Sequence, residues 1–423
     1  MPSPDIDRRR FLRTAAGAGA LTAGLVAGCE PKDQQPADAE DIDQPTLDRV
    51  GPRLDYQGPN VILIRFGGGV RRLETILDPE HTYCPFVYHE LIGKQGILFP
   101  NVDMEYKPGT VVTSHGQGTL YILTGKFDHY EDISRKPFAD RFEPKVPTVF
   151  EYLRRHYEIP AHQALIINGE DRIDEEFYTF SNHHQYGIRY RSTVLSLYRF
   201  KTFLLREELA GEDLSDKDRD AKEKQLHDMV SKDYRVQDIT VVSPKLDEFW
   251  RDWRGYYGKS GLVNPRGDRL LTELALRAMK QLRPRMMMIN YQDPDYVHWG
   301  NPHFYTRAIS TIDDGIRQIY QAAQADEEYR DNTVFLIIPD CGRDSNRCMA
   351  VPFQHHFGAK SAYQLFAVAA GRDARGKVKI DHPGRPVDKS YPQISMASTV
   401  ANIMGFPADH VDHGASSFEE MLA

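Results

Sequence analysis

Several side chains that could bind a metal ion follow directly after apolar runs of the sequence. The run "MMMINY" is followed by acids and a histidine, "FLIIP" is followed by an acid and a thiol, and "AVPFQHHFG" contains a histidine pair. In chain order, these candidate metal ligands are Asp293, Asp295, His298, Asp340, Cys341, His355 and His356. Carboxylate, imidazole and thiolate groups together suit zinc or another transition metal. The sequence therefore predicts a metal site if the fold brings these three segments together.

Strands that alternate with helices would bring the three segments together. Apolar runs predict strands within 60–72, 85–103, 146–169, 283–292, 332–340 and 361–371, and helices within 118–126, 305–324 and 394–405. Nearly unbroken apolar strands that alternate with helices are typical of a parallel sheet covered on both faces. We therefore expect a three-layer α/β fold with a mostly parallel sheet, in which ligands bind at the carboxyl ends of the strands.

One part of the chain has a different composition. Residues 200–235 are highly charged and contain few apolar residues, which predicts solvated helices. We expect an insertion or cap at about 166–282 that edges the site, within one domain that spans 58–423. A separate partner-binding module is the alternative for residues 200–235.

The N-terminus predicts export. Residues 1–28 contain an arginine cluster, then an Ala- and Gly-rich run that is too short and too Gly-rich to span a bilayer well, as in a twin-arginine signal peptide. The following "LVAGC" resembles a lipobox, which implies a lipid on Cys29. Residues 30–48 carry seven acids and one lysine, so 29–57 is expected to be a flexible linker. The prediction is a globular head held at the periplasmic face of a bacterial membrane.

The overall composition fits a soluble globular head. The chain has 423 residues, of which 40% are hydrophobic and 27% charged, and its formal net charge is −8. That length allows one large α/β domain with a full core. No basic stripe is present, so nucleic acid is not an expected partner.

Six segments, in order, resemble the alkaline phosphatase superfamily, which includes the sulfatases and nucleotide pyrophosphatases. They are "NVILIRFGGG", "PFVYHELIGKQGILFPNV", "SHGQGTLYILTG", "DPDYVHWGN", "NTVFLIIPDCG" and "STVANIMGFPADHVDHGASSFEEML". The resemblance covers most of 58–165 and 283–420. It implies the family's α/β fold and a site with two metal ions.

The ligands that the resemblance implies for the first ion all have counterparts in this sequence. They are Asp295 or Asp293, then His298, then His355 or His356. The spacing from Asp295 to His298 is one residue shorter than in the usual motif, so Asp293 remains an alternative.

The second ion and the nucleophile are where this sequence departs from the family. Gly67 stands at the first aspartate position, His115 at the nucleophile position, and Cys341 follows Asp340 where the family has a histidine. The resemblance therefore implies one divalent ion in preference to two, with zinc as the expected metal. Cys341 could be a ligand, a buried thiol, or half of a disulfide with Cys348.

Two functions remain open from the sequence. The first is a metal-dependent hydrolase of small phosphate or sulfate esters, attacked by water or by a hydroxyl near Thr113 and Ser114, with His115 as general base or ligand. Arginines that could bind the anionic substrate are Arg65, Arg71, Arg72 and Arg343.

The second possible function is that of a non-catalytic lipoprotein that keeps the fold in a binding or structural role, since a site without its nucleophile loses the covalent route. A phosphate-binding loop at "RFGGGVRR" is disfavoured, because it lacks the required Lys-Ser/Thr.

Overall fold

The computed structural model describes most of the predicted globular head. The described residues are 53–128, 144–169, 178–211, 214–230, 243–258, 267–298, 302–344, 354–355, 358–380 and 383–422. The predicted signal peptide, most of the linker with Cys29, and the residues His356 and Cys348 lie outside them. Within these described ranges, no helix is long and apolar enough to cross a membrane.

An eight-stranded sheet forms the centre of the fold, in the order β4-β3-β5-β1-β6-β7-β2-β8. The strands are β1 (Asn60–Phe66), β2 (Gly96–Asp103), β3 (Ala164–Asn168), β4 (Thr193–Leu195), β5 (Met286–Tyr291), β6 (Thr333–Pro339), β7 (Gln364–Gly371) and β8 (Tyr391–Pro392). Strands β4, β3, β5, β1 and β6 are all parallel, whereas β7 runs antiparallel to both β6 and β2. The expected α/β fold with a mostly parallel sheet is therefore confirmed.

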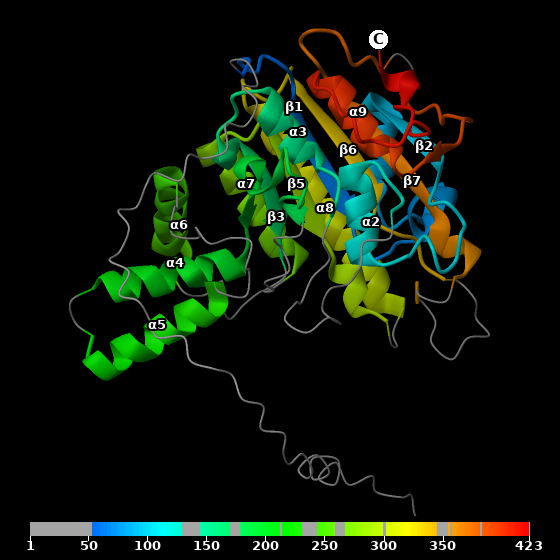
Figure 1. The fold of residues 1–423 in the computed structure, drawn as a ribbon. Coiled ribbons are helices and arrows are strands. Elements are labelled where there is room, and N and C mark those ends of the chain that lie inside the picture. The colour runs from blue at the N-terminus through cyan, green and yellow to red at the C-terminus, as the bar shows by residue number, and fades with distance from the viewer. Residues whose placement is uncertain are drawn as a thin grey trace, which may run out of the picture. The chain divides into compact units, whose positions relative to one another are not determined.

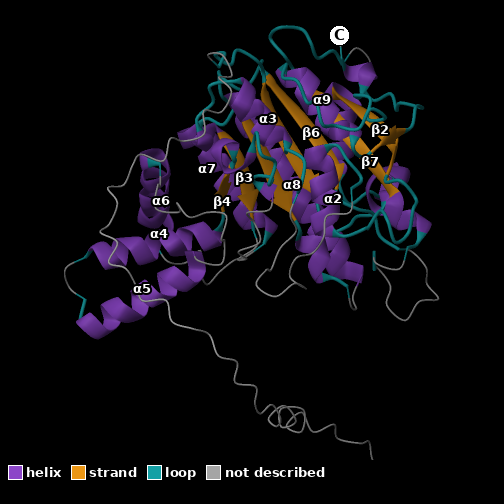
Figure 2. Ribbon diagram, in the orientation of Figure 1, coloured by secondary structure: helices purple, strands orange, loops and turns teal. Residues whose placement is uncertain are grey.

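Helices cover both faces of this sheet (Figures 1 and 2). The helices are α1 (Gly93–Gln95), α2 (His115–Thr124), α3 (Val149–His156), α4 (Leu197–Ala210), α5 (Asp216–Val230), α6 (Pro244–Tyr257), α7 (Asp268–Leu282), α8 (Pro302–Ala325) and α9 (Ser395–Met404). Val61 and Leu63 of β1 pack with α2, α3 and α9, while Ile62 and Ile64 pack with α7 and α8. Because each strand contributes to two cores, its sequence is apolar without interruption.

The register of the central strands aligns the ends that carry the candidate ligands. Phe66, the last residue of β1, pairs with Tyr291 of β5 and with Pro339 of β6. The three strands are parallel, so the chain leaves all three at the same edge of the sheet. Residues 67–72, 292–298 and 340–344 therefore meet there, as expected for a parallel sheet.

Parts of the predicted insertion belong to the sheet layers. Within 166–282, β4 pairs with β3, and α7 packs on the core beneath β5. Helices α4 and α6 bury Phe200 and Trp250 in that same core. The described segment 180–192 lies against α3, where Gly187 donates to Glu151. That the remaining residues cap the site stays a prediction.

Candidate metal site

A helical turn after β5 carries the first two candidate ligands. In this turn, η9 (Asp293–Tyr296), the backbone N–H of Asp295 donates to the carbonyl of Gln292 at 2.9 Å. The carboxylate of Asp268, at the start of α7, accepts from the backbone N–H groups of Gln292 and Asp293, each at 2.8 Å. Asp268 of α7 therefore fixes the conformation of the turn. Within this segment, His298 Nε2 lies 2.5 Å from Asp295 Oδ1.

Helix α2 delivers His115 to the same place. Ser114 caps the helix by accepting the backbone N–H of Gln117 at 3.3 Å. The helix packs very closely on the end of β6: a Cβ at Gly118 would lie 2.0 Å from the carbonyl oxygen of Asp340, so only glycine fits. This close approach holds His115, at the first turn of α2, directly against Asp340.

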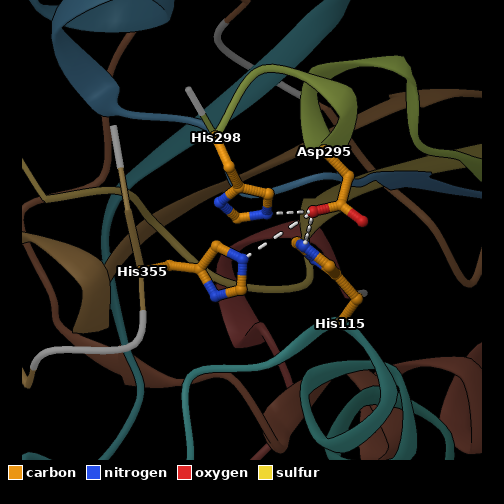
Figure 3. A group of neighbouring side chains, drawn as sticks. All are labelled: His115, Asp295, His298 and His355. Atoms are coloured by element: carbon orange, nitrogen blue, oxygen red, sulfur yellow. Dashed lines mark hydrogen bonds and ion pairs between the residues drawn. The ribbon is translucent and has the colours of Figure 1, made fainter. Parts of the chain in front are cut away.

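Three imidazoles converge on one carboxylate oxygen (Figure 3). Asp295 Oδ1 lies 2.6 Å from His115 Nε2, 2.5 Å from His298 Nε2 and 3.9 Å from His355 Nε2. The donor atoms of these four residues all lie within 4.8 Å of one another, so the group could hold a metal ion. The structure therefore brings together His298, His355 and His115, of which the sequence named His355 as an alternative to His356 and His115 as a general base or ligand.

The hydrogen bonds of two histidines orient their Nε2 atoms for metal binding. His355 Nδ1 lies 2.6 Å from the carbonyl oxygen of Thr113, and His115 Nδ1 lies 2.8 Å from Asp340 Oδ2. Both of these oxygens only accept, so Nδ1 of each ring carries a proton. In His355 this leaves the lone pair on Nε2, whereas Nε2 of His115 also faces an acceptor, Asp295 Oδ1, at 2.6 Å. An imidazole with its Nδ1–H bound in this way is the usual form of a metal-binding histidine. Three imidazoles and a carboxylate suit zinc or a similar transition ion, so the donor set fits the expected metal.

The charged residues of this group change one another's pKa values. Burial raises the pKa of Asp295, but hydrogen bonds from His115, His298 and His355 outweigh it and hold the pKa well below its usual range. Burial lowers the pKa of His115, but the neighbouring Asp340, Cys341 and Asp295 outweigh it and raise the pKa well above 6.5. Without a metal ion, the group is thus a carboxylate paired with an imidazolium.

A second group of donors shares His115 with the first. Asp340 and Cys341 lie on the Nδ1 side of His115, and Cys341 Sγ is 3.9 Å from Nδ1. Both residues are fully buried, and Arg65 Nη1 lies 3.5 Å from Asp340 Oδ2. Cys341 is a free thiol among the described residues. Cys348, its predicted alternative partner, lies outside them, so the disulfide stays untested. Burial raises the pKa of the Cys341 thiol to about 11.

Other candidate residues have different surroundings. Asp293 lies outside both donor groups, and its Oδ1 accepts the backbone N–H of Asp268 at 3.1 Å. The Thr113 hydroxyl donates to the carbonyl oxygen of His355, and the Ser114 hydroxyl caps α2. Both hydroxyls are therefore engaged in contacts that stabilise the local backbone. This favours water over either hydroxyl as the nucleophile.

The predicted anion-binding arginines also form internal contacts. Arg71 pairs with Glu74, and Arg72 donates to the carbonyl of Pro100 at 2.9 Å. Arg343 is fully buried and donates to the backbone carbonyls of Gly68 and Gly69, each at 2.7 Å, and of Val297 at 2.9 Å. It therefore ties the loop after β1 to the loop that carries His298.

Sequence reasoning missed Asp268, which braces the turn that carries Asp295. Asp268 is fully buried, and the Gln292 and Asp293 N–H groups bind its two carboxylate oxygens. An acid at the first position of a helix ordinarily interacts with the helix N-terminus itself. In the sequence, Asp268 is only an acid before the apolar residues Leu270 and Leu271, a pattern that is shared by many acids at helix starts.

Comparisons with known proteins identify similar solved structures only. No family model matches the chain, and no curated protein matches it. A protein in the alkaline phosphatase superfamily from Vibrio parahaemolyticus is 11% identical, with a TM-score of 0.43, and the match covers 87% of this chain and 71% of that one. The lipoteichoic acid synthase LtaP from Listeria monocytogenes is 12% identical, with a TM-score of 0.44 and coverage of 83% and 73%. A sulfatase from Pseudoalteromonas sp. is 12% identical, with a TM-score of 0.44 and coverage of 87% and 72%.

The protein from Vibrio parahaemolyticus is described as a member of the superfamily that the sequence motifs resemble. At such low identities and TM-scores, the likeness concerns the fold and says nothing about activity. Any function of this chain must therefore be supported by the geometry of its own site.

Proposed function

We propose that this protein is a metal-dependent hydrolase of small phosphate or sulfate esters that works with one divalent ion. The observation that carries the proposal is the convergence of His115, His298 and His355 on one oxygen of Asp295, at the carboxyl edge of the sheet. Zinc is the metal we expect there, because imidazole and carboxylate ligands suit it. A bound divalent ion supplies Lewis-acid polarisation of an ester oxygen and lowers the pKa of water.

The number of ligands decides between a catalytic and a structural site. A catalytic zinc site has three protein ligands and an open position, whereas a structural site is closed by four. Asp295, His298 and His355 form a three-ligand set, which leaves His115 for another role. His115 Nε2 points at the same place, and Asp340 holds its Nδ1 at 2.8 Å. A cation bound at Asp295 would replace the proton between Asp295 and His115 and would disfavour the imidazolium. We therefore assign His115, in its neutral form, as the general base that accepts a proton from the attacking water.

A metal-binding protein without catalysis is the second candidate. It is favoured by the contacts of the Thr113 and Ser114 hydroxyls, which are held in the framework next to the site. In that case, His115 would be a fourth ligand and would close the site. The two candidates therefore differ in what His115 does.

The place of action remains part of the proposal. The twin-arginine signal at 1–28 and the lipobox before Cys29 support export and a lipid anchor at the periplasmic face of a bacterial membrane. A head tethered in this way would meet small anionic esters outside the cytoplasm. Mass spectrometry of the native protein tests this directly, because an unlipidated or intact N-terminus would contradict it.

Substitution of His115 distinguishes the two candidates. We expect the zinc-loaded protein to hydrolyse p-nitrophenyl phosphate, bis(p-nitrophenyl) phosphate or p-nitrophenyl sulfate. His115→Ala should lower kcat by about 100-fold or more, as for loss of a general base, while zinc content stays near the wild-type value. The matched control is His183→Ala, because His183 lies in the segment beside α3 and stacks on His184. Loss of zinc from His115→Ala, with no hydrolysis by the wild type, would support the non-catalytic candidate instead.

A further inference from the structure

The carboxylate of Asp340 is surrounded by donors. Its Oδ1 accepts the backbone N–H groups of Gly69 at 3.2 Å and of Cys341 at 2.7 Å. Its Oδ2 lies 2.8 Å from His115 Nδ1 and 3.5 Å from Arg65 Nη1. A carboxylate has about four lone-pair positions, and here four donors face them. An ion in the second donor group would have to displace one of these contacts.

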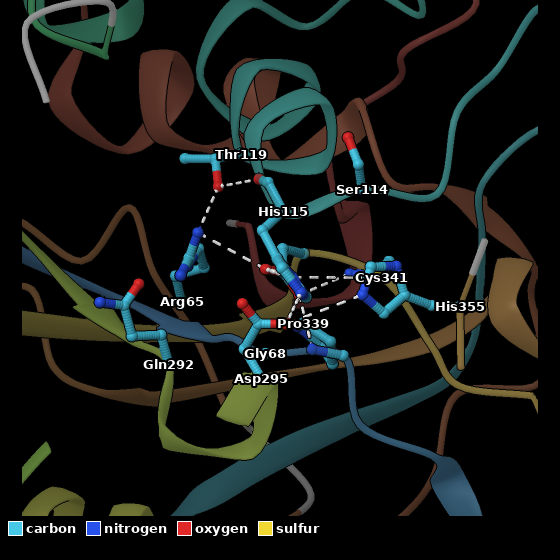
Figure 4. Close-up of polar contacts among 12 residues, drawn as sticks. Arg65, Gly68, Ser114, His115, Thr119, Gln292, Asp295, Pro339, Cys341 and His355 are labelled. Atoms are coloured by element: carbon cyan, nitrogen blue, oxygen red, sulfur yellow. Dashed lines mark hydrogen bonds and ion pairs between the residues drawn. The ribbon is translucent and has the colours of Figure 1, made fainter. Parts of the chain in front are cut away.

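Arg65 is the charged member of this set. Its side chain is only 1% exposed, and it donates to the Thr119 hydroxyl at 2.7 Å and to the Tyr291 carbonyl at 3.1 Å. These contacts fix the guanidinium between α2 and the ends of β5 and β6, as Figure 4 shows. A buried charge needs a partner of opposite charge, and the ion pair with Asp340 supplies it.

The residue at 67 makes room for this guanidinium. A Cβ at Gly67 would lie 2.6 Å from both Arg65 Nε and Arg65 Nη2, and 2.1 Å from the Tyr291 carbonyl oxygen. A side chain at 67 and the observed position of Arg65 therefore exclude each other. Glycine at 67 is thus required on two counts, by the Tyr291 backbone and by the guanidinium of Arg65.

We infer that the guanidinium of Arg65 takes the place of a metal ion in the second donor group. His115, Asp340 and Cys341 then form a metal-free relay, meaning a hydrogen-bonded group that positions His115, and not a second metal site. This inference rests on the proposed one-ion hydrolase site at Asp295. The guanidinium balances the charge of Asp340, and Asp340 in turn orients His115 so that Nε2 faces the first donor group. Arg65 and Asp340 are thus positioning residues that act through His115, and Cys341 is a buried thiol beside them.

Titration of the metal-free protein with Co²⁺ tests this inference. We expect one equivalent to bind, with visible d–d bands and without the near-ultraviolet band that a thiolate ligand produces. Binding of two equivalents, or a thiolate band, would place a second ion at Cys341 and overturn the inference while leaving the proposed site intact. Binding of no ion would overturn the proposed site, and the inference with it.

Two variants examine the roles of the thiol and the guanidinium. Cys341→Ser should leave the number of bound ions and the spectrum unchanged, whereas loss of one equivalent would contradict the relay. Arg65→Met, which removes the charge but keeps most of the side-chain volume, should allow a second equivalent to bind with a thiolate band. A folded Arg65→Met protein that still binds one equivalent would contradict the role of Arg65. The control is Arg71→Met, because Arg71 pairs with Glu74 and should leave the titration unchanged.

The pH profile of kcat tests whether Asp340 positions His115. Partners that orient a metal-site histidine typically contribute 10- to 100-fold in metal affinity or activity. Asp340→Asn should therefore lower kcat by about 10- to 100-fold and shift the pH profile of kcat, with the Co²⁺ count still at one. An unchanged pH profile would show that Asp340 does not act through His115.

Discussion

At the residue scale, the structure distinguishes between two aspartates that are two positions apart. Asp295 lies among three imidazoles, whereas the Asp293 carboxylate accepts the backbone N–H of Asp268 and so holds its own turn. Burial raises the pKa of Asp293, and the imidazoles lower that of Asp295 despite its burial. Of the two aspartates, the geometry therefore favours Asp295 as the proposed metal ligand.

Substitution of each aspartate by asparagine should separate their roles. Asp295→Asn removes an anionic ligand, and we expect zinc affinity to fall by about 100-fold or more, because ligands are worth at least as much as the residues that orient them. Asp293→Asn is the matched control and should keep its zinc, since it changes only the contact between the turn and the start of α7. Elemental analysis and zinc titration of both variants measure this. Equal losses would mean that the turn, and not Asp295, limits binding.

The sequence predicted His298 and one histidine of the pair His355 and His356 as ligands. It also predicted Asp295, with Asp293 as the alternative. Spacing along the chain could not choose between them, because the choice depends on which carboxylate the η9 turn directs inward. Arg65 was named only as a possible anion-binding residue. Its pairing with Asp340 depends on a register between β1 and β6 that the sequence does not specify.

At the scale of single elements, α3 contains a buried acid with a structural role. Thr148 and Glu151 form a capping box at the start of α3. Glu151 also accepts the Ser181 hydroxyl and the Gly187 N–H, each at 2.8 Å, so it connects α3 to the segment 180–192. Burial raises its pKa from 4.5 to about 7, although these hydrogen bonds oppose the shift.

The raised pKa of Glu151 predicts how stability depends on pH. Between pH 4.5 and 7, the folded state holds the Glu151 proton more tightly than the unfolded state. The free energy of unfolding should therefore fall as pH rises through this window, by on the order of 3 kcal/mol from this residue. Glu151→Gln cannot ionise, so its denaturation curves across this range should show a smaller fall than those of the wild type.

Glu158→Gln is the control for this pH dependence, because the Glu158 side chain is 67% exposed and its loss should leave the slope unchanged. Asp313, whose pKa burial raises to about 6, should account for part of the fall that remains in Glu151→Gln. Parallel curves for wild type and Glu151→Gln would contradict a raised pKa for Glu151.

At the scale of the whole molecule, the layers of the fold were predictable and the strand directions were only partly so. Unbroken apolar strands between helices indicated a covered parallel sheet, and five adjacent strands are parallel. The antiparallel β7 could not be predicted, because an apolar run has the same composition in either direction. The sheet edge that carries the site depends only on β5, β1 and β6, so this part of the prediction was unaffected.

Zinc-dependent unfolding tests most directly that an ion binds at Asp295, His298 and His355. A ligand that binds only the folded state stabilises it, by about 2.7 kcal/mol at 100 times its Kd. We predict that zinc raises the melting temperature of the metal-free wild type by several degrees and has little effect on His298→Ala. His183→Ala should respond as the wild type does. An equal rise for wild type and His298→Ala, or no rise for the wild type, would contradict a metal site at these residues.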